Sequence, residues 1–165
     1  MNQATLQQSG KGYDVATVGN LSTFEGKAFL KEVVGTTGME VSFGSLAPGQ
    51  AVPFFHRHKL NEELYIVLSG EGIFTLDGNE VPVQSGSVVR IAPAVSRCTK
   101  CTGEVPLIYI CIQAQEGSLQ QYTMGYGVIE LYCAWRVPLG IAVENDGEGL
   151  EKTSAMFGAF MGNGF

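Results

Sequence analysis

Residues 49–70 read GQAVPFFHRHKLNEELYIVLSG and contain both histidines of the chain. His56 and His58 are two residues apart, so an extended backbone places both imidazoles on the same face. The acidic pair Glu62 and Glu63 follows after a short turn and opens an apolar run that predicts a β-strand. The pattern therefore predicts that two imidazoles and a carboxylate converge from adjacent extended segments.

Two imidazole nitrogens and one carboxylate oxygen are the protein ligands of many catalytic zinc and non-haem iron sites. Neutral nitrogen donors and one hard anionic oxygen suit a divalent transition metal. The same spacing also fits ordinary strand residues beside a solvated turn, which explains most His-x-His pairs taken alone. On spacing alone, both interpretations stay open.

The rest of the chain predicts an all-β fold. From Lys27 onward, short apolar or alternating runs recur at intervals of about 8–12 residues, a pattern typical of a β-sandwich or barrel. The runs are KAFLKEVV, MEVSFGSL, ELYIVL, GIFTL, EVPVQ, SVVRIA and PLIYICIQ. Asp77-Gly78 between two of them predicts a tight hairpin. No helix of ordinary length is expected before residue 144, and after Gln115 we expect one strand over 127–133 and a short helix within residues 151–165 that glycines end.

Length and charge exclude several classes of protein. A chain of 165 residues suits one domain, and its 45% hydrophobic content is enough to form a core. Ten basic against 16 acidic residues give a net charge of −6, so we expect no nucleic-acid or membrane partner. The first twenty residues lack a signal-peptide core, and no window reaches the roughly 18 apolar residues of a membrane helix. We therefore expect a cytoplasmic protein.

Two of the expected strands are apolar on both faces. Residues 62–68 place Leu64, Ile66 and Leu68 on the face opposite Tyr65. Residues 106–112 likewise have apolar side chains on both faces. A strand with one face in water alternates more cleanly. We expect the outer face of this sheet to be covered, either by a second copy of the chain or by its own terminal segments.

Residues 49–70 resemble the first sequence motif of the cupin superfamily: a glycine, His-x-His, a glutamate, then six residues and a glycine. Counting back from Gly70 makes Glu63, and not Glu62, the residue that matches the family's carboxylate ligand. The resemblance covers about residues 27–115 and implies a double-stranded β-helix, or jelly-roll, barrel, commonly found as a homodimer. It divides the chain into an N-terminal extension (1–26), the cupin barrel (27–116) and a C-terminal extension (117–165) of unknown role.

Residues 86–97 resemble the second cupin motif only in part. Where the family usually has a proline, a glycine and a third histidine, this chain has Ala92, Ala94 and Arg97. An arginine has no lone pair to donate, so it cannot replace a metal ligand. A guanidinium about 4 Å from a divalent ion would repel it by about 8 kcal/mol at an effective dielectric constant of about 20.

Three arrangements follow for Arg97. It pairs with Glu63 in a metal-free pocket, or it turns away while His56, His58 and Glu63 hold a metal. In the third arrangement it stands further out and clamps an anionic ligand with two nitrogens.

The resemblance implies a small-molecule-binding cupin with a divalent zinc, nickel, manganese or iron ion on His56, His58 and Glu63. If the protein is an enzyme, the resemblance implies metal-dependent chemistry on a small polar or carboxylated compound, such as dioxygenation, isomerisation or decarboxylation, without choosing among them. Arg97, Tyr65 and Phe54 are the candidate substrate contacts; aromatic residues at barrel positions are also often simply core. The alternatives are a metal-free ligand-binding or sensory barrel with an Arg97–Glu63 pair, and a purely structural dimer.

Overall fold

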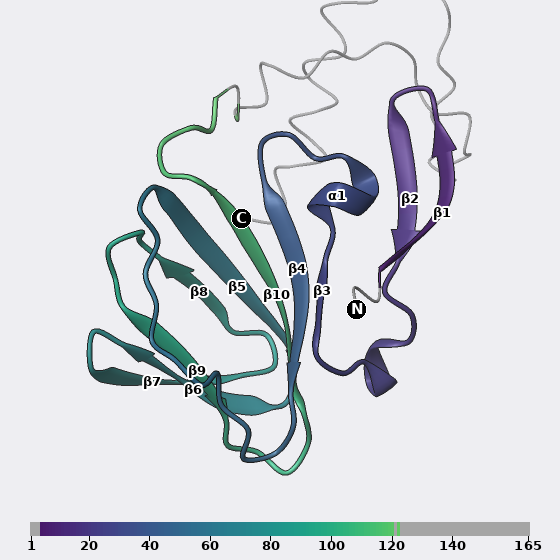
Figure 1. Cartoon of the computed structure of the whole chain (residues 1–165). Coiled ribbons are helices and arrows are strands. Elements are labelled where there is room, and N and C mark those ends of the chain that lie inside the picture. The colour runs from purple at the N-terminus through teal and green to yellow at the C-terminus, as the bar shows by residue number, and fades with distance from the viewer. Residues whose placement is uncertain (1–3, 121, 123–165) are drawn as a thin grey trace, which may run out of the picture. The chain divides into compact units, whose positions relative to one another are not determined.

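The computed structural model describes residues 4–120 and 122, and the regular elements among them are nearly all β-strands (Figure 1). In chain order the elements are β1 (Thr5–Gly10), β2 (Tyr13–Thr17), η1 (Leu21–Thr23), β3 (Lys27–Phe29), α1 (Lys31–Val34), β4 (Glu40–Leu46), β5 (Asn61–Ser69), β6 (Glu71–Leu76), β7 (Asn79–Gln84), β8 (Val88–Ile91), β9 (Arg97–Cys101) and β10 (Leu107–Gln115).

Two antiparallel sheets form the barrel. The larger has the order β3-β4-β10-β5-β8 and the smaller the order β7-β6-β9. Asp77 and Gly78 form the turn between β6 and β7, both with positive φ, as the hairpin signal predicts. The expected all-β jelly-roll is confirmed.

The period-two alternation of β5 builds the inner face of the larger sheet. Glu63, Tyr65 and Val67 are buried, whereas the residues between them are half-buried on the other face. On the neighbouring strand β10, Cys111 lies directly opposite Tyr65. The apolar core between the sheets comprises Leu46, Tyr65, Val67, Phe74, Val83, Ile91, Cys101, Leu107, Tyr109 and Cys111. Glu63 is therefore a carboxylate on a face that is otherwise core.

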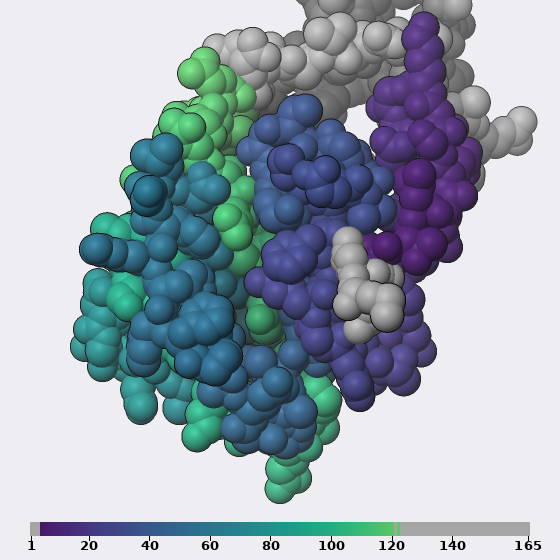
Figure 2. Space-filling model, in the orientation of Figure 1, coloured from purple at the N-terminus to yellow at the C-terminus, as the bar shows by residue number. Residues whose placement is uncertain are grey.

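The segment between β4 and β5 runs antiparallel beside β9, and it is mostly exposed at the surface (Figure 2). Val52 N donates to Thr99 O at 2.9 Å, and His56 N donates to Arg97 O at 3.1 Å. No continuous strand forms at the two histidines, where the structure has only isolated bridges. Even so, this pairing sets His56 directly opposite Arg97.

Three further local expectations differ from the structure. The run KAFLKEVV divides into strand β3 and the short helix α1, which ends at Gly35 with a left-handed φ of 65°. Strand β9 was not expected, because RCTKC has only two apolar residues, both cysteines. The hairpin β1–β2 was also missed, because its strands are exposed and carry no alternating apolar pattern.

The barrel strands of the two main sheets lie between Lys27 and Gln115. The division at residues 26 and 116 stays a prediction. The strand expected over 127–133 and the helix expected within 151–165 lie outside the described residues. Within the described part of the chain, no helix is long and apolar enough to cross a membrane.

Gly70, the last residue of the first motif, is expected to tolerate no side chain. Its φ is +80°, and an added Cβ would collide with the backbone carbonyl group of Pro106. We expect Gly70→Ala to lower the free energy of unfolding by about 3 kcal/mol, measured by urea denaturation. Gly86→Ala is the matched control, because Gly86 has a φ of +87° and open space around it. It should cost only about 1 kcal/mol, and equal losses would contradict the proposed collision.

Candidate metal and ligand site

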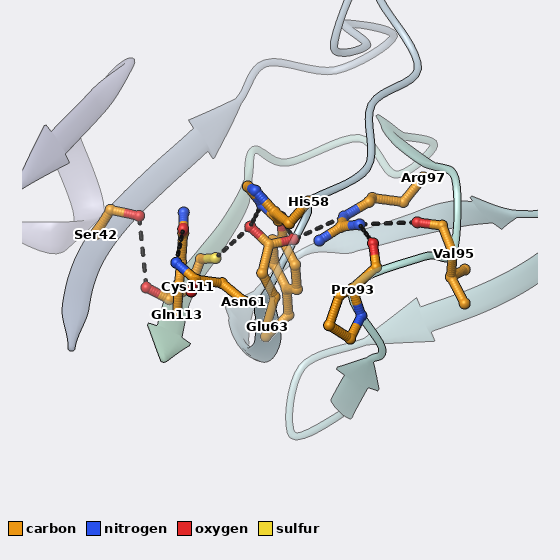
Figure 3. Close-up of polar contacts among 10 residues, drawn as sticks. Ser42, His58, Asn61, Glu63, Pro93, Val95, Arg97, Cys111 and Gln113 are labelled. Carbon is orange, nitrogen blue, oxygen red and sulfur yellow. Dashed lines mark hydrogen bonds and ion pairs between the residues drawn. The ribbon is translucent and has the colours of Figure 1, made fainter. Parts of the chain in front are cut away.

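Glu63 is the centre of the polar cluster inside the barrel (Figure 3). Its exposed fraction is 2%, and both carboxylate oxygens have partners. His58 Nε2 lies 3.0 Å from Oε1, and the Cys111 thiol donates to the same oxygen at 3.5 Å. Arg97 Nε donates to Oε2 at 2.9 Å, and the Tyr65 hydroxyl donates to it at 3.2 Å. The carboxylate is therefore held from both sheets.

These partners keep Glu63 ionised. Burial alone would raise the pKa of its carboxyl group, but the hydrogen bond with His58 and the charge and hydrogen bond of Arg97 outweigh burial, so the pKa is lowered. Burial and the nearby Glu63 charge raise the pKa of the Cys111 thiol to about 12. The thiol is consequently protonated at neutral pH and acts as a donor to the carboxylate.

The two histidines come together as the period-two spacing predicts. Their ring centroids are 5.4 Å apart, and His58 is fixed by its backbone N–H donating to Pro93 O at 3.0 Å. One ligand atom from each of His56, His58 and Glu63 lies within 4.8 Å of the others. The predicted convergence of two imidazoles and a carboxylate is confirmed.

His56 is suited to be a neutral nitrogen donor. Partial burial lowers the pKa of its imidazole, an effect that the Glu63 charge opposes and the Arg97 charge reinforces. Its Nδ1 atom is buried and has no hydrogen-bond partner among the described residues. A neutral imidazole with a free nitrogen is what a transition metal needs as a ligand.

The donor set fits a divalent transition metal. One nitrogen from each histidine and one carboxylate oxygen of Glu63 lie within 4.8 Å of one another, and they would have to move closer to lie about 2.0–2.2 Å from one ion. Glu63 Oε2 is held by Arg97 and Tyr65, whereas Oε1 faces His58 and has the longer Cys111 thiol contact as its other partner, so Oε1 is the oxygen on the histidine side. Binding would require His58 to exchange its hydrogen bond with Oε1 for the ion.

Arg97 points into the barrel and is 1% exposed. Besides Glu63, its Nη1 donates to Pro93 O at 3.2 Å and to Val95 O at 2.8 Å. The arrangement in which Arg97 turns away is therefore wrong, because the guanidinium satisfies its charge on the Glu63 carboxylate. Among the described residues only Nη2 of Arg97 has no partner, and the two-nitrogen clamp on a ligand stays a prediction. The pairing of Arg97 with Glu63 is the arrangement found.

The two aromatic candidates occupy different places. Tyr65 is 5% exposed and contacts Phe74 and Tyr109 edge-on or tilted, so its ring is part of the core while its hydroxyl reaches Glu63. Phe54 is 59% exposed, and its ring centroid lies 5.7 Å from that of His56. Tyr65 thus helps to orient the carboxylate, whereas Phe54 is an exposed ring in contact with His56.

Sequence reasoning missed two residues near the cluster. Cys111 is on the inner face of β10, and only the register of β10 against β5 reveals that its thiol reaches Glu63. The charge of Lys27 at the start of β3 acts on both His56 and Cys111. Neither residue stands within a recognisable motif.

A separate cavity of about 670 Å³ shares no residue with this cluster. It is lined by Gly70, Glu71, Gln84, Ser85, Thr102, Gly103, Glu104 and Val105. Its only charged side chains are two glutamates. The cavity therefore lacks the nitrogen donors and buried charges that distinguish the cluster around Glu63.

Comparison with known proteins agrees with this geometry. The cupin domain family matches residues 42–113. A cupin protein from Bacteroides fragilis of known crystal structure is 40% identical, with a TM-score of 0.68 over 73% of this chain and 99% of that one.

Two curated relatives match over 67 residues, which are 41% of this chain. An uncharacterized protein from Methanocaldococcus jannaschii is 31% identical, and an oxalate-binding protein from Thermotoga maritima is 33% identical. The chain spans 54% of the length of each of these two relatives.

Proposed function

The chain belongs to the cupin superfamily, and from that premise we propose that it binds a small carboxylated compound at a divalent metal held by His56, His58 and Glu63. The observation that carries the proposal is the grouping of three ligand atoms within 4.8 Å inside the barrel. Zinc, nickel, manganese and iron all accept this donor set. When bound, such an ion supplies Lewis acidity toward an oxygen of the ligand.

The residues around the three ligands support this role. Arg97 and Tyr65 fix Oε2 of Glu63, which orients the carboxylate and leaves its other oxygen toward His58. Hydrogen-bonded partners that orient a ligating carboxylate are a common part of metal sites. In this proposal Arg97 and Tyr65 are positioning residues for Glu63.

Elemental analysis tests the proposal. Untagged wild-type protein is expected to carry about one equivalent of transition metal per chain, and His56→Ala is expected to lose it. Arg57→Ala is the matched control, because Arg57 stands between the two histidines but is exposed and outside the cluster. Metal-free wild-type protein whose melting temperature does not change with zinc, nickel, manganese or iron would overturn the proposal.

A second candidate function is a metal-free ligand-binding or sensory barrel. The observation that favours it is the 2.9 Å ion pair of Arg97 with Glu63, with both side chains almost fully buried. This pair neutralises the carboxylate without an ion. The metal-free outcome of the elemental analysis, with ligand binding retained, would support this candidate over the first.

The carboxylate preference draws on the relatives. One curated relative is an oxalate-binding protein, which indicates a small anionic ligand. A divalent ion beside the neutralised Glu63–Arg97 pair would leave the site with net positive charge, which favours an anion. Isothermal titration of oxalate and acetate into the metal-loaded chain tests this preference.

We also propose that the chain is a cytoplasmic homodimer. Leu64, Ile66 and Leu68 on β5 form a row on the outer face of the larger sheet, and Val88 on the neighbouring β8 is 61% exposed. Covering an apolar sheet face stabilises association. Light scattering at micromolar concentration should give twice the mass of the 17.6 kDa chain, and a monomer would contradict the proposal.

A further inference from the structure

We infer that the ligand is a small monocarboxylate with an apolar, planar substituent, in preference to a bare dicarboxylate such as oxalate. The inference rests on the proposed function and deepens it. It depends on how polarity changes along the path from solvent to Glu63.

A row of contacting side chains leads from solvent to the buried carboxylate. Phe54 lies outermost, with its ring edge-on to His56 at 5.7 Å. His56 contacts His58 at 5.4 Å, and His58 reaches Glu63 at 3.0 Å. A ligand bound at the histidines therefore lies within reach of Phe54.

The inner end of the row suits a carboxylate. Arg97 is almost fully buried, and its Nη2 has no hydrogen-bond partner among the described residues. A buried donor without a partner is costly, and an anionic oxygen would satisfy it. Glu63 Oε2 is already occupied by two donors, so it does not compete for this nitrogen.

The outer end suits an apolar group. Phe54 keeps 59% of its surface exposed, although its ring already contacts the His56 ring. A planar apolar substituent would bury part of that ring and form an aromatic contact with it. A second carboxylate at this end would place a charge against the apolar Phe54 ring.

Phe55 provides a matched control. Its exposed fraction is also 59%, but in the described part of the chain it forms no ring contact with either histidine. Removing Phe54 or Phe55 therefore deletes the same amount of exposed apolar surface. Only Phe54 should affect a ligand bound at the histidines.

The test is isothermal titration of benzoate, acetate and oxalate into the full chain, with and without one equivalent of zinc. Wild-type protein should bind benzoate about tenfold more tightly than acetate, and more tightly than oxalate. Phe54→Ala should bring the benzoate-to-acetate ratio close to one. Phe55→Ala should leave the ratio unchanged.

The outcomes separate this inference from the proposed function. If acetate or oxalate binds as tightly as benzoate, or if both alanine variants change the ratio equally, the inference is wrong while carboxylate binding stands. If none of the three carboxylates binds with or without zinc, the proposed carboxylate function fails and the inference fails with it.

Discussion

Arg97→Met is expected to lower the free energy of unfolding at pH 7 by about 3–5 kcal/mol. The substitution removes the guanidinium that donates to Glu63 at 2.9 Å and leaves a carboxylate that is 2% exposed without its cation. Leaving a buried charge uncompensated is more costly than losing the pair itself. Urea denaturation, monitored by circular dichroism, measures the free energy of unfolding of the variant and of wild-type protein.

Two variants distinguish the lost pair from lost packing. The double variant Arg97→Met, Glu63→Leu should lose less stability than Arg97→Met alone, because no buried charge is left. Arg90→Met is the matched control, since Arg90 forms ion pairs with Glu62 and Glu116 at the surface. It should change stability little, because exposed ion pairs contribute little.

The pH dependence provides an independent check. In wild-type protein the lowered pKa of Glu63 contributes stability that is present above the ordinary glutamate pKa and is lost as pH falls through the folded value. In Arg97→Met the carboxyl group loses the contribution of Arg97 that lowers its pKa, so protonation becomes easier and relieves part of the penalty. The difference in the free energy of unfolding between wild-type protein and Arg97→Met should therefore become smaller as pH falls from 7 toward 4. A difference that is independent of pH would show that packing, and not the buried charge, causes the loss.

Local patterns predicted the barrel because most of its strands can be recognised from their own residues. The alternation through Tyr65 and Val67 and the Asp77-Gly78 turn are properties of adjacent residues, and both are found in the structure. Strand β9 was missed because Arg97, Thr99 and Lys100 are polar. Its pairing with β6 and the burial of alternate residues make it a strand. The secondary structure of such a segment depends on its tertiary contacts and cannot be predicted from its residue types alone.

The site was predictable to the extent that its members are neighbours in sequence. His56, His58 and Glu63 lie within eight residues, so a short bridged segment and one turn bring them together. The contact of Arg97 with Glu63 joins opposite sheets across 34 residues of sequence. Three arrangements were therefore open until the register of β9 was known. Cys111 reaches Glu63 across 48 residues, and no local pattern signals that contact.

Arg97→His is expected to tighten zinc binding by at least about a hundredfold. The arginine stands where the resemblance to cupins implies a third histidine, and its backbone pairs directly with His56. The substitution removes a positive charge beside the ligand set and adds a nitrogen donor. Charge repulsion of several kcal/mol is expected over about 5 Å at an effective dielectric constant of about 20, and each 1.4 kcal/mol corresponds to about tenfold in affinity. Isothermal titration of zinc into metal-free protein at pH 7.5 measures the effect.

Arg97→Gln separates the two contributions, because glutamine removes the charge without providing an imidazole. By the same charge argument it should bind zinc at least about tenfold more tightly than wild type, and more weakly than Arg97→His. Circular dichroism of each variant shows whether the barrel remains folded. If both folded variants bind zinc no more tightly than wild type, the guanidinium does not oppose an ion at His56, His58 and Glu63. In that case the pairing of Arg97 with Glu63 supports the positioning of the carboxylate without weakening metal binding.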